Sequence, residues 1–384
     1  MSLSYFSLAL ILIVVALDLE NVRSVWRRRV LDVAEVGCDD YTLVIPLYGD
    51  PRYFADRRLI ERHKPNVLVA CDVGPSVMQQ FANQLEREGW RVQRSIHAHP
   101  TAPMLIKSAL DEGAISTAYT LKVDADTVVP EGIDRAIESM RRDGADVCSF
   151  KCGVLDPRSL CEKLQAQEYA MAMLSRHHRP WLLSGACYAA RTSLFREVLA
   201  RHTLWLFAED FEFGRIARHL HLRVRHLEFT VYTQVPSGWR ELWRQRSVGW
   251  WLGSFQHNWV NLDHNVLLTP VSSFYYVGVV GLGFWLRWWP LAHLTDWPYL
   301  MLYLGTMFGA YTVLLFAANW RVRSVWLLLM PYYSFFQSTL MTPIGLVNYA
   351  RHAVRIRSLG RYHVGYRREH ISARQPERAI GAVT

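Results

Sequence analysis

Acidic side chains stand at the ends of three short apolar runs in the sequence. They are Asp50, Asp72 and the pair Asp124 and Asp126. Two carboxylates at positions i and i+2 can both face one ligand if the chain turns where they leave a strand. Carboxylate oxygens suit Mg²⁺ or Mn²⁺, which keep water or substrate phosphates as their remaining ligands. The Asp124–Asp126 spacing therefore predicts a site for a metal-bound diphosphate, although each acid alone is more often a turn residue.

A second acidic pair, Glu209 and Asp210, opens a segment with helical periodicity. An acid in the first turn of a helix is commonly there because the helix dipole favours it. A carboxylate placed within hydrogen-bond reach of an acceptor hydroxyl can also act as a general base. Upstream, the small-residue segment that begins Ser184, Gly185 follows an apolar run and is a candidate for substrate contact.

Residues 237–257 read as a Trp-rich amphipathic helix. At 100° per residue, Trp239, Trp243 and Trp250 share one face, which is typical of a helix at a membrane interface. Arg246 falls on that same face. Its guanidinium either reaches lipid phosphates or lies beside Trp to meet a diphosphate, and the sequence leaves both interpretations open.

These residues need a scaffold that brings strand ends together. Apolar segments at 41–47, 66–71 and 119–123 alternate with amphipathic segments at 76–88, 132–142 and 212–219. This alternation predicts an α/β domain with a mostly parallel sheet and helices on both faces. Ligands of such sheets bind at the carboxyl ends of the strands, where the acids stand.

Apolar residues are unevenly distributed along the chain. We expect an N-terminal transmembrane anchor at 1–20, a catalytic domain at 40–235 and an amphipathic interface helix at 236–262. A transmembrane region at 266–350 and a basic tail at 351–384 follow. The long uncharged stretches are 266–286, 297–320 and 324–350, each long enough to span a bilayer.

Basic residues at 23–29 place the large domain in the cytoplasm by the positive-inside rule, at the plasma or inner membrane. Buried helices of a soluble protein are the competing interpretation of the apolar stretches. Pro331, Pro343 and Gly345 make the last stretch a candidate broken or re-entrant segment, which favours a cytoplasmic tail.

Composition agrees with this division. The chain has 384 residues, of which 51% are hydrophobic and 20% charged, and these values exclude a disordered protein. A net charge of +9 with 15 Trp is compatible with nucleic acid, a membrane or sugar as partner. Because much of the basic charge flanks apolar stretches and fills the tail, we expect no nucleic-acid partner.

In order and spacing, the motifs resemble those of the glycosyltransferase family 2 membrane synthases, which include hyaluronan, chitin and cellulose synthases. They are Pro46-Leu47-Tyr48-Gly49-Asp50, Asp72, Asp124-Ala125-Asp126, Ser184-Gly185-Ala186, Glu209-Asp210 and Gln245-Arg246-Ser247-Val248-Gly249-Trp250. The chain departs from the family at QxxRW, where Val248 and Gly249 stand in place of Arg and Trp. It also has Gly49-Asp50 where the family has Asn-Glu.

The resemblance implies a GT-A fold (Rossmann-like) with one N-terminal and about three C-terminal transmembrane helices. It implies inverting sugar transfer from a UDP-sugar donor with Mn²⁺ or Mg²⁺ as cofactor. The implied donor-binding residues are Pro46, Tyr48, Asp50, Asp72, Asp124, Gln245, Arg246 and Trp250. The implied acceptor-binding residues are Ser184, Gly185 and Trp251, the metal ligands Asp126 and Asp124, and the catalytic residues Asp210 with Glu209.

Three functions remain open at this point. The first is a processive polysaccharide synthase that extrudes its product through the bilayer. The second is a single-sugar transfer to a membrane lipid acceptor, which the departure at QxxRW favours. The third is a non-catalytic membrane protein. No residue in the sequence identifies the sugar or the linkage.

Overall fold

The structure is a computed structural model. It describes residues 33–54, 57–98, 100–176, 180–202, 204, 208–250, 297–319 and 324–337, and the single positions 344, 347 and 351. The expected anchor at 1–20, the apolar stretch at 266–286 and nearly all of the basic tail lie outside the described residues, as does Trp251.

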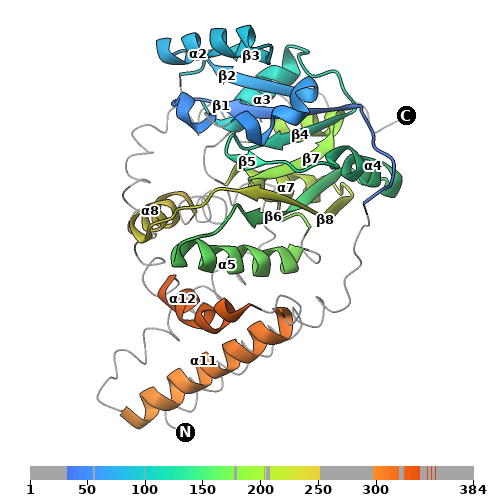
Figure 1. Cartoon of the computed structure of the whole chain (residues 1–384). Helices are drawn as coiled ribbons and strands as arrows, with labels where there is room; N and C mark the ends of the chain where they lie inside the picture. Colours follow the sequence, from blue (N-terminus) through green and yellow to red (C-terminus); the bar gives the residue numbers. More distant parts are fainter. Residues whose placement is uncertain are drawn as a thin grey trace.

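An eight-stranded sheet with the order β3-β2-β1-β4-β7-β6-β8-β5 forms the centre of the molecule (Figure 1). Its strands are β1 Tyr41–Leu47, β2 Val67–Asp72, β3 Arg91–Ser95, β4 Tyr119–Val123, β5 Thr127–Val128, β6 Val147–Val154, β7 Cys187–Arg191 and β8 Val224–Thr233. The neighbours from β3 to β4 are parallel, as are β6 and β8, whereas β7 and β5 run antiparallel to their neighbours. The expected mostly parallel α/β sheet is confirmed.

Helices cover both faces of the sheet. On one face, α2 (Ser76–Arg87) and α4 (Ile133–Asp143) pack against β1, β2 and β4. On the other face lie α3 (Ala102–Asp111), α6 (Thr192–Leu199) and α7 (Glu209–His219). Every residue of β1, β2 and β4 is buried, because strands covered on both faces must be apolar on both sides.

The strands expected at 41–47 and 119–123 have the predicted bounds. The helix expected at 212–219 begins earlier, at Glu209, so both members of the acidic pair lie in its first turn. Three short 3₁₀ segments, η1 (Pro51–Phe54), η2 (Arg57–Leu59) and η3 (Glu61–Asn66), connect β1 to β2.

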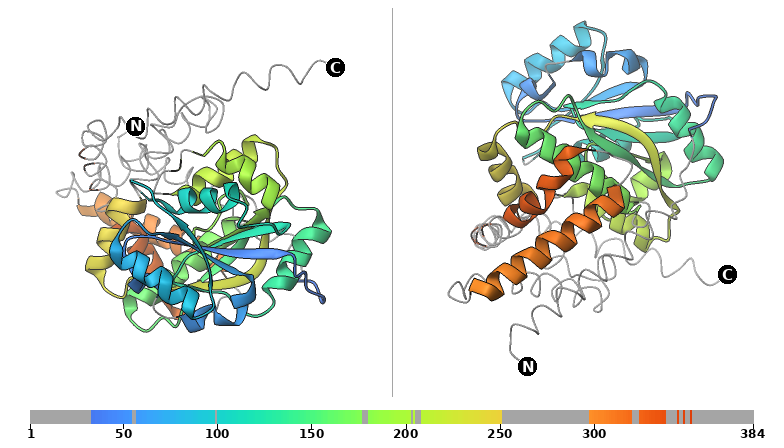
Figure 2. Two further views of the ribbon diagram at one scale, coloured as in Figure 1. Left: turned by 90° about the horizontal axis from the view of Figure 1, so that it is seen from above. Right: turned by 60° about the horizontal axis from the view of Figure 1, so that its bottom comes forward.

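Helix α5 (Leu160–Arg176) lies between the sheet and the C-terminal helices α12 (Met330–Phe336) and α11 (Trp297–Asn319) (Figures 1 and 2). A 3₁₀ segment, η6 (Val325–Leu329), precedes α12 and also contacts α5. The C-terminal helices therefore pack directly against the α/β domain. Among the residues that the structure describes, no helix is both long and apolar enough to cross a membrane.

The helix expected over 237–257 is shorter than predicted. It consists of α8 (Trp239–Arg244) followed by a π-helical segment, η4 (Gln245–Trp250), and the residues beyond are not described. The ring centroids of Trp239 and Tyr333 are 6.2 Å apart, and those of Trp243 and Phe336 are 6.5 Å apart. The aromatic face assigned to lipid thus contacts α12, although Trp239 remains 46% exposed.

Candidate active site

The motifs lie at the carboxyl ends of the parallel strands, which form one edge of the sheet. Because β1, β2, β4, β6 and β8 share one direction, their carboxyl ends lie at the same edge, and antiparallel β7 starts there. Tyr48 follows β1, Asp72 ends β2 and Asp124 follows β4. Ala186 immediately precedes β7. The backbone N–H of Asp124 donates to the carbonyl of Ala186 at 3.0 Å, which ties two of the motifs together.

A buried lysine connects the acidic motifs. The side chain of Lys122, in the middle of β4, is only 1% exposed. Its Nζ lies 2.6 Å from Oδ1 of Asp124 and 3.1 Å from Oε1 of Glu209, and it also donates to the carbonyl oxygen of Gly185. Burial lowers the pKa of Lys122, but the two carboxylates outweigh it and raise the pKa well above its usual range. The ammonium is therefore charged.

Asp124 and Asp126 form the acidic end of β4. Burial, together with the charges of Glu209 and Asp126, raises the pKa of Asp124 to about 6 despite the opposing charge of Lys122. The Asp124 side chain is 41% exposed, so water reaches it and moderates this shift. Burial also raises the pKa of Asp126, whose Oδ1 accepts a hydrogen bond from the Thr233 hydroxyl at 3.4 Å. Both carboxylates can accept a cation.

Glu209 and Asp210 enter the same site from the first turn of α7. A Cβ atom added to Gly185 would lie 3.3 Å from Oδ2 of Asp210, so a residue without a side chain allows this close approach. Burial and the neighbouring Glu209 raise the pKa of Asp210 to about 7, while Lys122 and Arg176 act in the opposite direction. A carboxyl group with a pKa near neutrality is suited to accept a proton from a hydroxyl group.

Ionisable side chains within electrostatic reach of one another form one group at this edge. They are Asp124, Asp126, Glu209, Asp210, Lys122 and Arg176. When all four acids are ionised, they face two cations, which leaves two uncompensated negative charges. In the described part of the chain, no three His, Cys, Asp or Glu side chains could hold a metal ion between them. Two uncompensated negative charges match one divalent cation, and Mg²⁺ typically binds through one or two carboxylates and takes its other ligands from water and substrate phosphates.

Two other predicted acids stand in different surroundings. Asp72 is 2% exposed, and its Oδ1 accepts the backbone N–H of His97 at 3.0 Å, which fixes the end of β2. Asp50 is bound to Arg52, whose guanidinium donates to both carboxylate oxygens and whose backbone N–H donates to Oδ1. These hydrogen bonds lower the pKa of Asp50. Asp50 therefore forms a local turn, whereas Asp72 is held at the site edge.

Pro46 is buried in β1, and Tyr48 is partly buried against the core on the α3 side of the sheet. Ser184 is 6% exposed beside Gly185. Gln245 is exposed at the start of η4, and Trp250 ends that segment. A π-helical turn holds one more residue than an α-helical turn, so the side chains after Gln245 do not follow the 100° spacing assumed for a regular helix.

The family resemblance implied donor binding by Arg246, and the structure gives its side chain a protein partner. Its side chain is 1% exposed, and Nη2 donates to Oε2 of Glu168 on α5 at 2.7 Å. The Tyr333 hydroxyl of α12 donates to the same Glu168 oxygen at 3.1 Å. Apolar side chains of α5, α8, η6 and α12 surround this junction. Arg246 is therefore neither a solvated surface charge nor a lipid-facing one.

Sequence reasoning missed Lys122, Arg176, Glu168 and Tyr333. One signal was available for Lys122, since it is the one charged residue of β4 and stands two residues before Asp124, which puts both side chains on the same side of the sheet. The other three belong to no motif. Their partners lie far away in the sequence, and only the fold brings them together.

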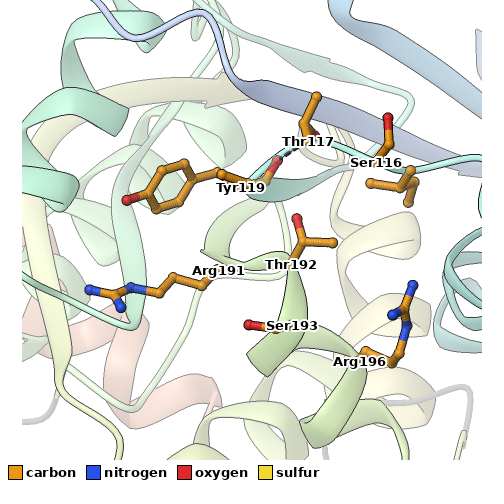
Figure 3. A pocket seen from close by; sticks show the side chains of 9 residues that line it. Ser116, Thr117, Tyr119, Arg191, Thr192, Ser193 and Arg196 are labelled. Carbon is orange, nitrogen blue, oxygen red and sulfur yellow. Dashed lines mark hydrogen bonds between the residues drawn. The ribbon is translucent and has the colours of Figure 1, made fainter.

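A cavity of about 650 Å³ lies at the opposite edge of the sheet, near the start of β4 and the end of β7 (Figure 3). It is lined by Ile115, Ser116, Thr117, Ala118, Tyr119, Arg191, Thr192, Ser193 and Arg196. Arg196 donates to the carbonyl of Leu110 at 2.8 Å, and Arg191 lies 3.6 Å from Asp146. None of the predicted site residues lines this cavity.

The family of the chain follows from comparison with known proteins. The model of glycosyl transferase family group 2 matches residues 119–350, which include β4, the acidic pairs Asp124/Asp126 and Glu209/Asp210, and α11. This span is more than half of the chain, and the chain belongs to that family. It is a glycosyltransferase. No curated protein matches the chain significantly in sequence.

A solved structure shares its architecture. A mannosyltransferase from Pyrobaculum calidifontis, in complex with GDP-Man and Mn²⁺, is 14% identical over 91% of this chain and 99% of its own, with a TM-score of 0.52. At that identity the likeness concerns the fold alone. Staphylococcus aureus TarS 1-349 in complex with UDP-GlcNAc is 15% identical over 84% of this chain and 92% of its own, with a TM-score of 0.39. The family match and the fold shared with the mannosyltransferase make the sheet GT-A-like, as the resemblance implied.

Proposed function

We propose that this glycosyltransferase is membrane-embedded and inverting, takes a hexose from a UDP-sugar with Mn²⁺ or Mg²⁺, and extends a polysaccharide processively. One observation carries the catalytic part of the proposal. Lys122 pairs with Asp124 and donates to the carbonyl of Gly185, and Gly185 lies directly beside the carboxylate of Asp210, so the base and the strand-end carboxylates share one site. A proton acceptor and a cation site side by side are what sugar transfer from a diphosphate requires.

The donor side of the proposed site is the end of β4. Asp126 and Asp124 would hold the divalent cation, and Asp72, fixed by His97, would contact the nucleoside. When bound, a divalent cation supplies positive charge that offsets the charge developing on the leaving diphosphate. The assignment of Asp50 to the nucleoside is weaker, because Arg52 already occupies both of its carboxylate oxygens.

The acceptor side is the start of α7. Asp210 takes the proton of an acceptor hydroxyl while the hydroxyl oxygen forms a bond to the anomeric carbon. The bond from that carbon to the phosphate oxygen breaks, and the nucleoside diphosphate leaves with the bonding electron pair. Attack opposite the leaving group inverts the anomeric centre. The ion pair with Lys122 holds Glu209, and with it the first turn of α7, next to Gly185. Gly185 and Ser184 would face the acceptor.

Membrane insertion is supported by the chain's apolar segments. The stretch 297–320, which contains α11, has no charged residue. Large apolar side chains of α11 are exposed to solvent in the isolated chain: Trp297, Met301, Leu302, Val313 and Phe316. Exposed apolar surface of this kind marks contact with lipid or protein. We place the protein in the plasma or inner membrane with its catalytic domain in the cytoplasm.

A single-sugar transfer to a membrane lipid is the alternative. The small number of expected transmembrane helices favours it, because they would enclose only a narrow channel for a polymer. The departure from QxxRW also favours it. Arg246 bears on the choice, because Glu168 accepts a hydrogen bond from its guanidinium. An arginine that already pairs with a protein carboxylate binds a departing diphosphate less readily than an unpaired arginine does.

One experiment decides between these possibilities. The full chain, purified in detergent or vesicles, is incubated with Mn²⁺ or Mg²⁺ and a panel of UDP-sugars, with GDP-mannose included because the mannosyltransferase of similar fold binds it. Released nucleoside diphosphate is measured and the product is sized. A long, enzyme-digestible polymer supports the processive synthase, whereas a lipid bearing one sugar supports the alternative. Release of no nucleoside diphosphate from any donor would contradict the proposed function.

A further inference from the structure

Lys122 stands out among the buried polar residues of the described chain. A lysine ammonium has three N–H donors, and three acceptors surround this one: Asp124, Glu209 and the carbonyl of Gly185. Its hydrogen-bonding capacity is therefore saturated by the protein itself. Burying an ammonium group costs free energy unless the charge is fully paired, and here the protein pairs all three donors.

The three acceptors come from three separate segments. Asp124 follows β4, Gly185 lies in the loop before β7 and is 63 residues away from Lys122, and Glu209 opens α7 at a separation of 87 residues. These segments carry, in turn, the proposed metal ligand, the backbone that borders Asp210, and the acidic partner of Asp210.

We propose that Lys122 is the positioning residue of this active site, and that it fixes the metal-binding strand end and the start of α7 relative to one another. The inference rests on the proposed function. Because its three donors are already used, Lys122 does not itself touch the substrate. It holds one oxygen of Asp124 and one of Glu209, so that the other oxygen of each carboxylate remains for a ligand.

Its charge has a second consequence. With Lys122, the site retains two uncompensated negative charges, which match one divalent cation. Without Lys122, there would be three. A neutral residue at this position makes the site more negative and strengthens Mn²⁺ binding, while the carboxylates lose their geometry. Metal affinity and turnover should therefore change in opposite directions, which a general loss of folding cannot produce.

The test uses the full chain with Lys122→Met, which removes charge and hydrogen bonds, and Lys122→Gln, which removes the charge but keeps a donor. Lys107→Met is the matched control, because Lys107 pairs with Asp111 within one turn of α3. Mn²⁺ alone is titrated by calorimetry, and turnover is measured over a range of Mn²⁺ concentrations. We expect kcat to fall about 100-fold or more in both Lys122 variants. We expect the Mn²⁺ Kd to fall roughly threefold or more.

A double variant separates positioning from packing. Lys122→Met combined with Glu209→Gln removes one charge of each sign, so its unfolding temperature should recover most of what Lys122→Met alone loses, while turnover stays low. This measurement needs no donor and stands even if the wild-type chain transfers no sugar. A folded Lys122→Gln with turnover within about twofold of wild type would overturn the proposal. So would weaker Mn²⁺ binding in step with lower stability, or a double variant no more stable than Lys122→Met.

Discussion

The buried pair between Arg246 and Glu168 predicts a large loss of stability for Glu168→Gln. The substitution keeps the volume of the side chain but removes the charge that faces the guanidinium at 2.7 Å. Arg246 is 1% exposed and Glu168 17%, so water cannot replace the lost partner. Removing one member of a buried ion pair typically costs about 3–5 kcal/mol. Tyr333 can still donate to the amide oxygen, so we expect the lower end, about 3 kcal/mol.

The assay is thermal unfolding of the full chain in detergent, followed by Trp fluorescence. For a domain of this size, about 3 kcal/mol corresponds to a Tm lower by roughly 6–12 °C. The matched control is Asp156→Asn, which breaks a pair with Arg158 whose side chains are 67% and 84% exposed. Exposed pairs contribute about 1 kcal/mol or less. Equal shifts in the two variants would refute the view that the junction of α5, η4 and α12 is sealed from solvent.

Three further predictions concern activity. Because Asp210 acts as a base only when ionised and its pKa is about 7, kcat/KM should rise about tenfold per pH unit below pH 7 and level off above it; a flat profile from pH 5.5 to 8.5 would exclude Asp210 as the base. Gly185→Ala should push the Asp210 carboxylate by a few tenths of an ångström and lower kcat about tenfold or more with little change in Tm; unchanged turnover would show that the approach is not critical. Arg246→Ala should lower turnover more than membrane association, measured by flotation with vesicles, because its guanidinium pairs with Glu168 and does not face lipid; equal losses would contradict this buried placement.

Much of the fold is predictable because its signals are local. The strands β1 and β4 are short apolar runs bounded by turn residues, and their burial on both faces follows from a parallel sheet covered by helices. Once the sheet is parallel, the gathering of Asp72 and Asp124 at one edge follows from topology alone. The sequence also suffices to recognise Glu209 and Asp210 as an acidic pair at the start of a helix.

The rest depends on contacts between distant segments. The partners of Lys122 are 63 and 87 residues away, and Glu168 meets Arg246 across 78 residues. Nothing in the local pattern reveals such pairs. The end of α8 also escaped prediction, because a period of 3.6 residues was assumed where the chain forms a π-helical turn. The lipid-facing interpretation of Trp243 missed its contact with Phe336, because Phe336 belongs to α12, a distant segment of the chain.

The central claim is that sugar transfer takes place at the carboxyl edge of the sheet, with Asp126 on the metal and Asp210 as the base. It is tested most directly by the release of nucleoside diphosphate from the wild-type chain, Asp126→Asn and Asp210→Asn, each with saturating Mn²⁺ and the donor that the wild type uses. We expect both folded variants to lose activity about 100-fold or more. If both released nucleoside diphosphate at the wild-type rate, the site would lie elsewhere.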